Sequence, residues 1–296
     1  MSELVKSIAL PIAMITGSVL SGFFAGLVSV TPYLIFTMLF ITFCRIDLSQ
    51  MKPSMLHFWL LVCQIFGCVV VYLLLRMYDE TMAQGVLICV MAPTATSSVV
   101  IAGMLGANIA TMATFSLLSN VTVAIVAPII FSLVGTNADM PFIESFVIIL
   151  KKVVLLLVLP FVTAILLRMV ARKVYDTIGK YQIMSFYVWA FSLMVVSGQT
   201  VEFVKAQESS NYTTEILIAL GALTVCLCQF IGGRALGRRY GDTVAGGQSL
   251  GQKNTVLAIW MAQTYLHPIA SIGPSSYVLW QNIVNSWQIW RKRKKN

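Results

Sequence analysis

Residues 246–255 read GGQSLGQKNT and interrupt an apolar run that extends from residue 243 to residue 265. Three of the first six residues, Gly246, Gly247 and Gly251, are glycines, which weaken a helix because their backbone is unrestricted. In lipid, the amides and carbonyls that such a break frees need partners, so the break must be buried in protein or line a wet cavity. We therefore expect a membrane helix here with breaks at Gly247 and Gly251.

A second break is predicted in the apolar run from residue 83 to residue 103, where residues 92–98 read APTATSS. Pro93 removes a backbone donor and clashes with the preceding helical turn. Broken helix ends carry partial charges that hold ions and carboxylates. The alternative is that the small polar residues of both runs only allow neighbouring helices to pack closely.

The composition predicts an integral membrane protein. Hydrophobic residues make up 58% of the 296 residues and charged residues 10%, whereas a soluble domain has about 25% charged residues. A membrane helix takes roughly 20 apolar residues, and the runs between charges and turn residues give ten spans without a separate soluble domain. We expect these spans at residues 7–26, 30–44, 54–75, 83–103, 109–135, 148–168, 183–203, 213–233, 243–265 and 271–290.

The net charge of +9 is explained by membrane topology and not by nucleic-acid binding. Most of the 20 Lys and Arg residues fall in alternate predicted loops and in the C-terminal segment 291–295. The positive-inside rule then places both termini in the cytoplasm, which requires an even number of spans. We expect a bacterial inner membrane protein whose C-terminal basic residues contact anionic lipid.

The ten spans divide into two halves of five, residues 1–138 and 139–296, joined by a short polar stretch. Because five is odd, the halves have opposite orientations in the membrane, as in transporters built from inverted repeats. The two predicted breaks lie at corresponding positions, in the fourth and ninth spans. This layout predicts a substrate site near the middle of the bilayer, between the repeats.

Three short segments resemble the bile acid:sodium symporter family. Residues 249–258, SLGQKNTVLA, match the family's ninth-span pattern at Gly251, Asn254, Leu257 and Ala258. Residues 278–282 resemble its last-span Trp-His-Asn element, and residues 93–98 resemble its fourth-span break. The resemblance implies an all-α fold of two inverted five-helix repeats with a panel domain, a core domain, and broken, crossing fourth and ninth helices.

The resemblance also implies a cation site, and here the sequence departs from the family. The family's ninth-span glutamate corresponds to Ser249, its glutamine to Lys253, and its fourth-span asparagine to Val99, while Met112 replaces a fifth-span hydroxyl. Other sodium-binding positions look retained. The positions equivalent to the cation site are Lys253, Ser249, Gln252, Gln64, Ser98 and Ser116.

The distribution of charge also indicates that this site does not bind sodium. All eleven acidic residues lie in predicted loops or at span ends, whereas Lys253 lies near the centre of the ninth span. A charged lysine at that depth costs about 2.5–3.5 kcal/mol on insertion scales. We interpret its ammonium as occupying the space of a sodium ion. In that place the ammonium would bridge Gln64, Ser249 and the carbonyls of the break. The alternative is a snorkelling lysine at a misplaced span boundary.

These features predict a secondary transporter of a small organic anion that works without sodium. The resemblance implies that Thr96, Asn254 and Gln281 contact the anion, although each is also explained as an ordinary interhelical hydrogen bond. Three alternatives stay open: a proton-coupled carrier in which Lys253 titrates, a receptor or sensor of the same fold, and a different ten-span carrier family.

Other chemistry is not expected. No catalytic constellation lies at membrane depth, so we do not expect an enzyme. His57 and His267 are far apart and lack clustered cysteines or acids, so we expect neither a metal site nor a cofactor. The expected partners are the anion and membrane lipid. The sequence does not decide the oligomeric state, and it is compatible with a monomer.

Overall fold

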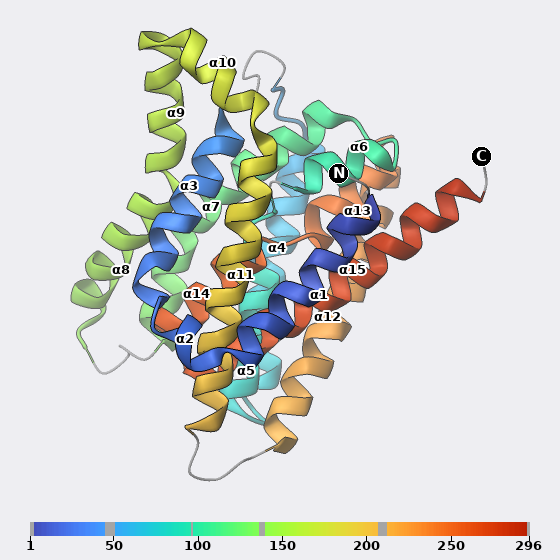
Figure 1. Ribbon diagram of the computed structural model, residues 1–296. Coiled ribbons are helices and arrows are strands. Elements are labelled where there is room, and N and C mark those ends of the chain that lie inside the picture. The colour runs from blue at the N-terminus through green and yellow to red at the C-terminus, as the bar shows by residue number, and fades with distance from the viewer. Residues whose placement is uncertain (1–2, 45–50, 96, 136–139, 207–211, 295–296) are drawn as a thin grey trace. The chain divides into compact units, whose positions relative to one another are not determined.

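The computed structural model describes residues 3–44, 51–95, 97–135, 140–206 and 212–294, which form helices joined by turns, without a strand among them (Figure 1). The chain divides into two compact units. Unit 1 comprises residues 1–48 and 127–208, and unit 2 comprises residues 49–126 and 209–296. Each unit draws on both predicted halves, so the predicted repeats 1–138 and 139–296 are a different division of the chain and stay a prediction.

Unit 1 is organised around its long helix α11, which packs against α1, α2 and α3. Gly17 of α1 allows one close approach, because a Cβ there would lie 2.3 Å from the Met194 carbonyl oxygen. The helices of this unit are α1 (Glu3–Val19), α2 (Ser21–Ala25), η1 (Val28–Val30), α3 (Thr31–Phe43), α8 (Phe142–Leu157), α9 (Leu159–Val170), α10 (Arg172–Lys180) and α11 (Gln182–Lys205).

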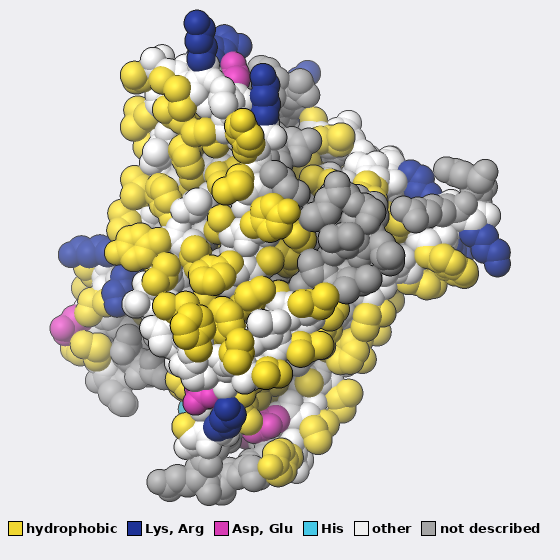
Figure 2. All heavy atoms as spheres, in the orientation of Figure 1, with side chains coloured by type: hydrophobic (Ala, Val, Ile, Leu, Met, Phe, Trp, Pro, Cys, Tyr) yellow, Lys and Arg dark blue, Asp and Glu magenta, His cyan; other side chains and the backbone are white. Residues whose placement is uncertain are grey.

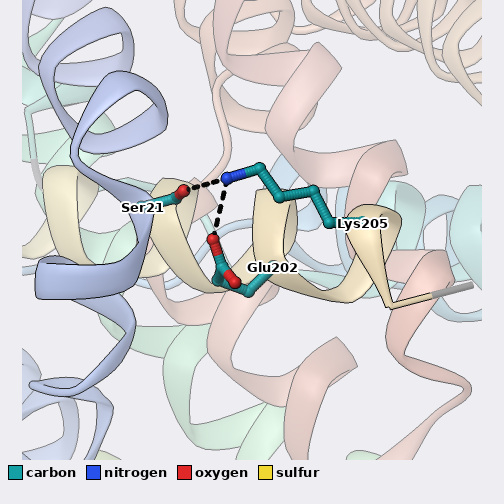
Figure 3. A network of polar contacts seen from close by, with 3 residues as sticks. All are labelled: Ser21, Glu202 and Lys205. Carbon is teal, nitrogen blue, oxygen red and sulfur yellow. Dashed lines mark hydrogen bonds and ion pairs between the residues drawn. The ribbon is translucent and has the colours of Figure 1, made fainter.

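A polar contact ties α11 to the start of α2 at one end of unit 1 (Figure 3). The Lys205 ammonium donates to the Ser21 hydroxyl at 2.7 Å and to a Glu202 carboxylate oxygen at 3.0 Å. Lys205 and Glu202 are well exposed, so their ion pair contributes little to stability.

Unit 2 is built around α12, which packs against α13, α5, α15 and α4. Its helices are α4 (Met55–Leu75), α5 (Glu80–Met91), α6 (Ser98–Met104), α7 (Ile109–Val134, whose last residues belong to unit 1), α12 (Tyr212–Arg239), α13 (Thr243–Gly251), α14 (Thr255–Tyr265), η3 (Pro268–Ser271) and α15 (Ile272–Arg293). All functional positions discussed below lie in this unit.

Five helical stretches of the described residues are long and apolar enough to cross a membrane. They are Met55–Leu75, Ile109–Val134, Phe142–Val170, Met184–Lys205 and Tyr212–Arg239. Each overlaps a predicted span, although the third begins at Phe142 and not at residue 148, and the fifth ends at Arg239 and not at residue 233. Val28–Phe43 and Glu80–Met91 are shorter apolar helices, and the total of ten spans stays a prediction.

The outer faces of these helices carry large apolar side chains. Phe66 and Leu74 of α4, Ile125 of α7, Leu166 of α9 and Ile231 of α12 are each more than half exposed. Figure 2 shows hydrophobic side chains over much of the visible face, with Lys and Arg in a few separate groups. Apolar outer faces on long helices fit contact with lipid.

Candidate functional site

Unit 2 contains two interrupted helices. One segment joins α5 to α6, another joins α13 to α14, and the two segments meet. The chain leaves α5 at Ala92 and enters α6 at Ser98, and it leaves α13 at Gln252 and enters α14 at Thr255. Thr94 and Lys253 form an antiparallel bridge. The Asn254 amide donates to the Pro93 carbonyl at 2.8 Å, and the Ala95 amide to the Gln252 carbonyl at 3.1 Å. We call residues 92–95 and 252–254 the crossing.

Side chains from three other segments cap the end of α5. A helix end leaves its last carbonyls without intrahelical partners. The Lys253 Nζ donates to the Val90 carbonyl at 2.7 Å, and the Gln64 Nε2 donates to the Met91 and Ala92 carbonyls at 2.8 and 3.0 Å. The Gln229 Nε2 reaches the Cys89 carbonyl at 3.4 Å. The break is therefore satisfied by protein groups, as a break in lipid must be.

The end of α13 is capped in a similar way. The Thr94 hydroxyl donates to the Ser249 carbonyl at 2.7 Å, and the Tyr277 hydroxyl donates to the Gly251 carbonyl at 2.8 Å. Gln281 of α15 holds the backbone of Lys253, accepting from its amide at 2.9 Å and donating to its carbonyl at 3.4 Å. Each broken helix therefore supplies a side chain that caps the other: Lys253 for α5 and Thr94 for α13.

Lys253 is a buried lysine whose amine has a carbonyl as its partner. Its side chain is 1% exposed, and within the described ranges it forms no ion pair. The carbonyl that it meets belongs to the C-terminal end of α5, where the helix dipole concentrates negative partial charge and favours a cation by about 0.3–2 kcal/mol. This geometry excludes a snorkelling side chain.

The predicted bridge from Lys253 to Gln64 and Ser249 was wrong. Gln64 occupies the two carbonyls that follow Val90, and its Oε1 accepts from the Ser119 hydroxyl at 3.0 Å. The Ser249 hydroxyl faces the Met112 sulfur at 3.4 Å. Lys253 and Gln64 therefore cap consecutive carbonyls of the same helix end. They do not bond to each other, because each donor already has a carbonyl as its acceptor.

Gly247 is also not a break. It lies inside α13, which ends at Gly251. A glycine inside a helix costs about 1 kcal/mol relative to alanine. Gly247 has a packing role: a Cβ there would lie 2.4 Å from the Arg234 Cγ. The break follows Gly251, where the backbone turns extended at Gln252.

The other predicted cation-site residues are Gln252 in the crossing, Ser98 at the start of α6 and Ser116 in α7. The Gln252 Nε2 donates to the Ser97 hydroxyl at 3.4 Å, and its Oε1 is buried without a partner. The hydroxyls of Ser98 and Ser116 are also buried, and no acceptor or donor meets them in the described part of the chain. These atoms are polar groups inside unit 2 that have no described partner.

The predicted substrate-binding residues differ in how many of their polar atoms already have hydrogen-bond partners. Asn254 caps α14, accepting from the Leu257 amide at 3.3 Å, and its Nδ2 donor is buried without a described partner. Gln281 uses both ends of its amide on the Lys253 backbone. Thr96 lies outside the described residues.

Sequence reasoning missed three capping residues, Gln229, Tyr277 and Ser119. The Gln229 Nε2 also donates to the Tyr277 hydroxyl at 3.0 Å, and the Ser119 hydroxyl accepts from the Thr94 amide at 3.2 Å. Each is a polar residue inside an apolar run, which is a signal that could have found them. Among the described residues, no group of three or more His, Cys, Asp or Glu could hold a metal ion.

Comparison with known families places the chain in one of them. The model of the SBF-like CPA transporter family matches residues 46–281, which contain both breaks and their capping residues. The chain belongs to this family. A comparison with curated proteins found no match. The SBF-like match supports the resemblance to bile acid:sodium symporters and makes the chain a member of a membrane transporter family.

Proposed function

We propose that this SBF-like protein is a secondary transporter of a small organic anion and that it works by alternating access without sodium. The observation that carries the proposal is the buried Lys253 ammonium, bonded at 2.7 Å to the Val90 carbonyl. It rests further on membership of a transporter family. Units 1 and 2 then correspond to a panel and a core, in a ten-span chain with both termini in the cytoplasm.

The sodium independence follows from the charge at the crossing. A sodium ion is held by oxygen ligands that supply negative charge, usually carboxylates and carbonyls. Here a lysine ammonium already occupies the carbonyl end of α5, and the position of the family's glutamate holds Ser249. A second cation beside the ammonium would be repelled. Lys253 therefore does the structural work of the ion.

The same charge favours an anionic substrate. The ammonium and the N-terminal end of α14 contribute positive potential at the crossing. The Asn254 Nδ2 and the Ser98 hydroxyl are buried donors without described partners. We propose that the anion binds there and that Thr96 and Gln281 also contact it. Whether Lys253 stays charged through the cycle or exchanges a proton distinguishes two forms of the same carrier.

A thermal-shift screen of organic acids, with and without sodium and across pH, would identify the ligand, because a ligand that binds the native state stabilises it. The expected result is stabilisation by at least one carboxylic acid and none by its neutral amide, independent of sodium.

Counterflow of that acid in proteoliposomes then separates transport from sensing. We expect radiolabelled acid to accumulate transiently against an internal load of unlabelled acid. Binding without counterflow would identify a receptor of the same fold and contradict the proposal. Empty liposomes and liposomes with heat-denatured protein are the controls.

A further inference from the structure

Arg234 of α12 is fixed against α13 by close helix packing. A Cβ on Gly233 would lie 2.3 Å from the Gly246 carbonyl oxygen, and one on Gly246 would lie 2.2 Å from the Gly233 oxygen. The backbones of α12 and α13 are therefore in contact. The stem of Arg234 lies over Gly247, where a side chain would collide with its Cγ. The stem of Arg234 therefore packs directly on the backbone of α13.

A chain of amide hydrogen bonds continues from the guanidinium. The Arg234 Nη1 donates to the Gln288 Oε1 at 3.2 Å. The Gln248 Nε2 donates to the same oxygen at 3.3 Å and to the Asn285 Oδ1 at 3.0 Å. Gln248, Asn285 and Gln288 are each at most 9% exposed. We call these three residues and Arg234 the Arg234 cluster.

The Arg234 cluster has positive charge and spare donors but no acid. In the part of the chain that the structure describes, Arg234 forms no ion pair. A guanidinium has five N–H donors in a planar fork, and one acceptor, the Gln288 Oε1, meets it here. The Asn285 Nδ2 is a further buried donor without a described partner, against one buried acceptor, the Gln248 Oε1. Such a balance favours a ligand that accepts hydrogen bonds.

The cluster is connected to the crossing through one face of α15. Gln281, Asn285 and Gln288 follow the i, i+4, i+7 spacing of a single helix face. All three are buried, and Gln281 holds the backbone of Lys253. A polar stripe on α15 thus leads from the Arg234 guanidinium to the crossing.

We propose that Arg234 and Gln288 form a second anion site, where the paired oxygens of a carboxylate or phosphate accept from the guanidinium. Arg suits this role because its fork matches two oxygens at once. Gln248, which also donates to Asn285, donates to the Gln288 oxygen and so holds the acceptor of the guanidinium in place. Resting on the proposed transport of an organic anion, the site holds that anion on its way to or from the crossing.

The test uses benzoate as probe and benzamide as its neutral match, with binding to the purified full-length protein measured by thermal shift and equilibrium dialysis. The variants are Arg234→Gln, the charge-conserving Arg234→Lys, and the control Arg239→Gln, an exposed arginine on the same helix. Each is also made in the Lys253→Gln background, so that binding at the crossing is separated from binding at Arg234.

We expect benzoate, and not benzamide, to bind Lys253→Gln protein. Arg234→Gln should weaken that binding by about tenfold or more, the effect of losing one charge-assisted hydrogen bond. The benzoate affinity of Arg234→Lys should lie between those of the parent protein and of Arg234→Gln, because lysine keeps the charge but lacks the planar fork of donors. Arg239→Gln should leave the affinity unchanged. Arg234-dependent binding without counterflow would keep this site and reject transport.

Three results would overturn the second site. One is benzoate binding that survives Arg234→Gln and is lost in Lys253→Gln, which places the anion at the crossing alone. Another is equal binding of benzamide, or no binding of benzoate to the wild type. The third is stabilisation that depends on Arg234 only in nanodiscs containing phosphatidylglycerol, and not with free benzoate or phosphate, which would assign Arg234 to a lipid headgroup.

Discussion

Replacing Lys253 with methionine is expected to lower the free energy of unfolding by about 1–3 kcal/mol, the cost of leaving a buried acceptor without a donor. The acceptor is the Val90 carbonyl, which Lys253 meets at 2.7 Å in a site with 1% exposure. Methionine has a similar volume and no donor, so packing changes little. Removing the ammonium also relieves its desolvation, and the expected net loss means that the lost carbonyl contact outweighs that relief.

Lys292 provides the matched control for this prediction. It also donates to the last turn of a short helix, meeting the Met104 carbonyl of α6 at 2.9 Å, but it lies partly exposed near the end of α15. Water can replace its donor, so Lys292→Met should change stability by less than about 0.5 kcal/mol. Unfolding of the purified variants in detergent, followed by tryptophan fluorescence, measures both. Equal effects, or a stabilised Lys253→Met protein, would show that the buried ammonium does not hold the crossing.

A second large effect is expected at the contact between α12 and α13. Gly233→Ala places a Cβ 2.3 Å from the Gly246 carbonyl oxygen, and a backbone atom cannot swing aside as a side chain end can. We expect destabilisation of about 1–3 kcal/mol or more, as for other overpacked interiors. Transport should fall as well, because α13 carries the residues that enter the crossing.

The neighbouring glycine is the control for this contact. A Cβ on Gly232 meets nothing within 4 Å, so Gly232→Ala should be neutral or stabilising by up to about 1 kcal/mol through helix propensity. Paired unfolding measurements on the two variants test the contact directly. If alanine were tolerated equally at both positions, α12 and α13 would not lie in backbone contact.

The crossing shows how far sequence reasoning reaches. Pro93 and the glycines near 246–251 indicated where two apolar runs are interrupted, because their local chemistry disfavours a helix. Lys253 stood out because a lysine inside an apolar run needs a partner. Its partner, the Val90 carbonyl, could not be predicted, since any free carbonyl of the break would serve and the choice depends on how the two segments meet.

The residues that sequence reasoning missed act over long separations in the chain. Gln229 caps a carbonyl of α5, and Tyr277 caps a carbonyl of α13, each from a different helix. A single polar residue in an apolar run carries no information about which helix it faces. Gly247 was misread for a related reason: a glycine that makes room for Arg234 and a glycine that ends a helix look alike in sequence.

Counterflow of the identified acid in sodium chloride and in choline chloride, for wild type and Lys253→Gln, tests the central claim most directly. If the Lys253 ammonium takes the place of a bound sodium ion, the wild-type counterflow rates are equal in the two salts. The rate of Lys253→Gln is then lower in both salts by about tenfold or more, the effect of losing one charge-assisted hydrogen bond. Wild-type counterflow that stops without sodium, together with an unimpaired Lys253→Gln protein, would contradict the account.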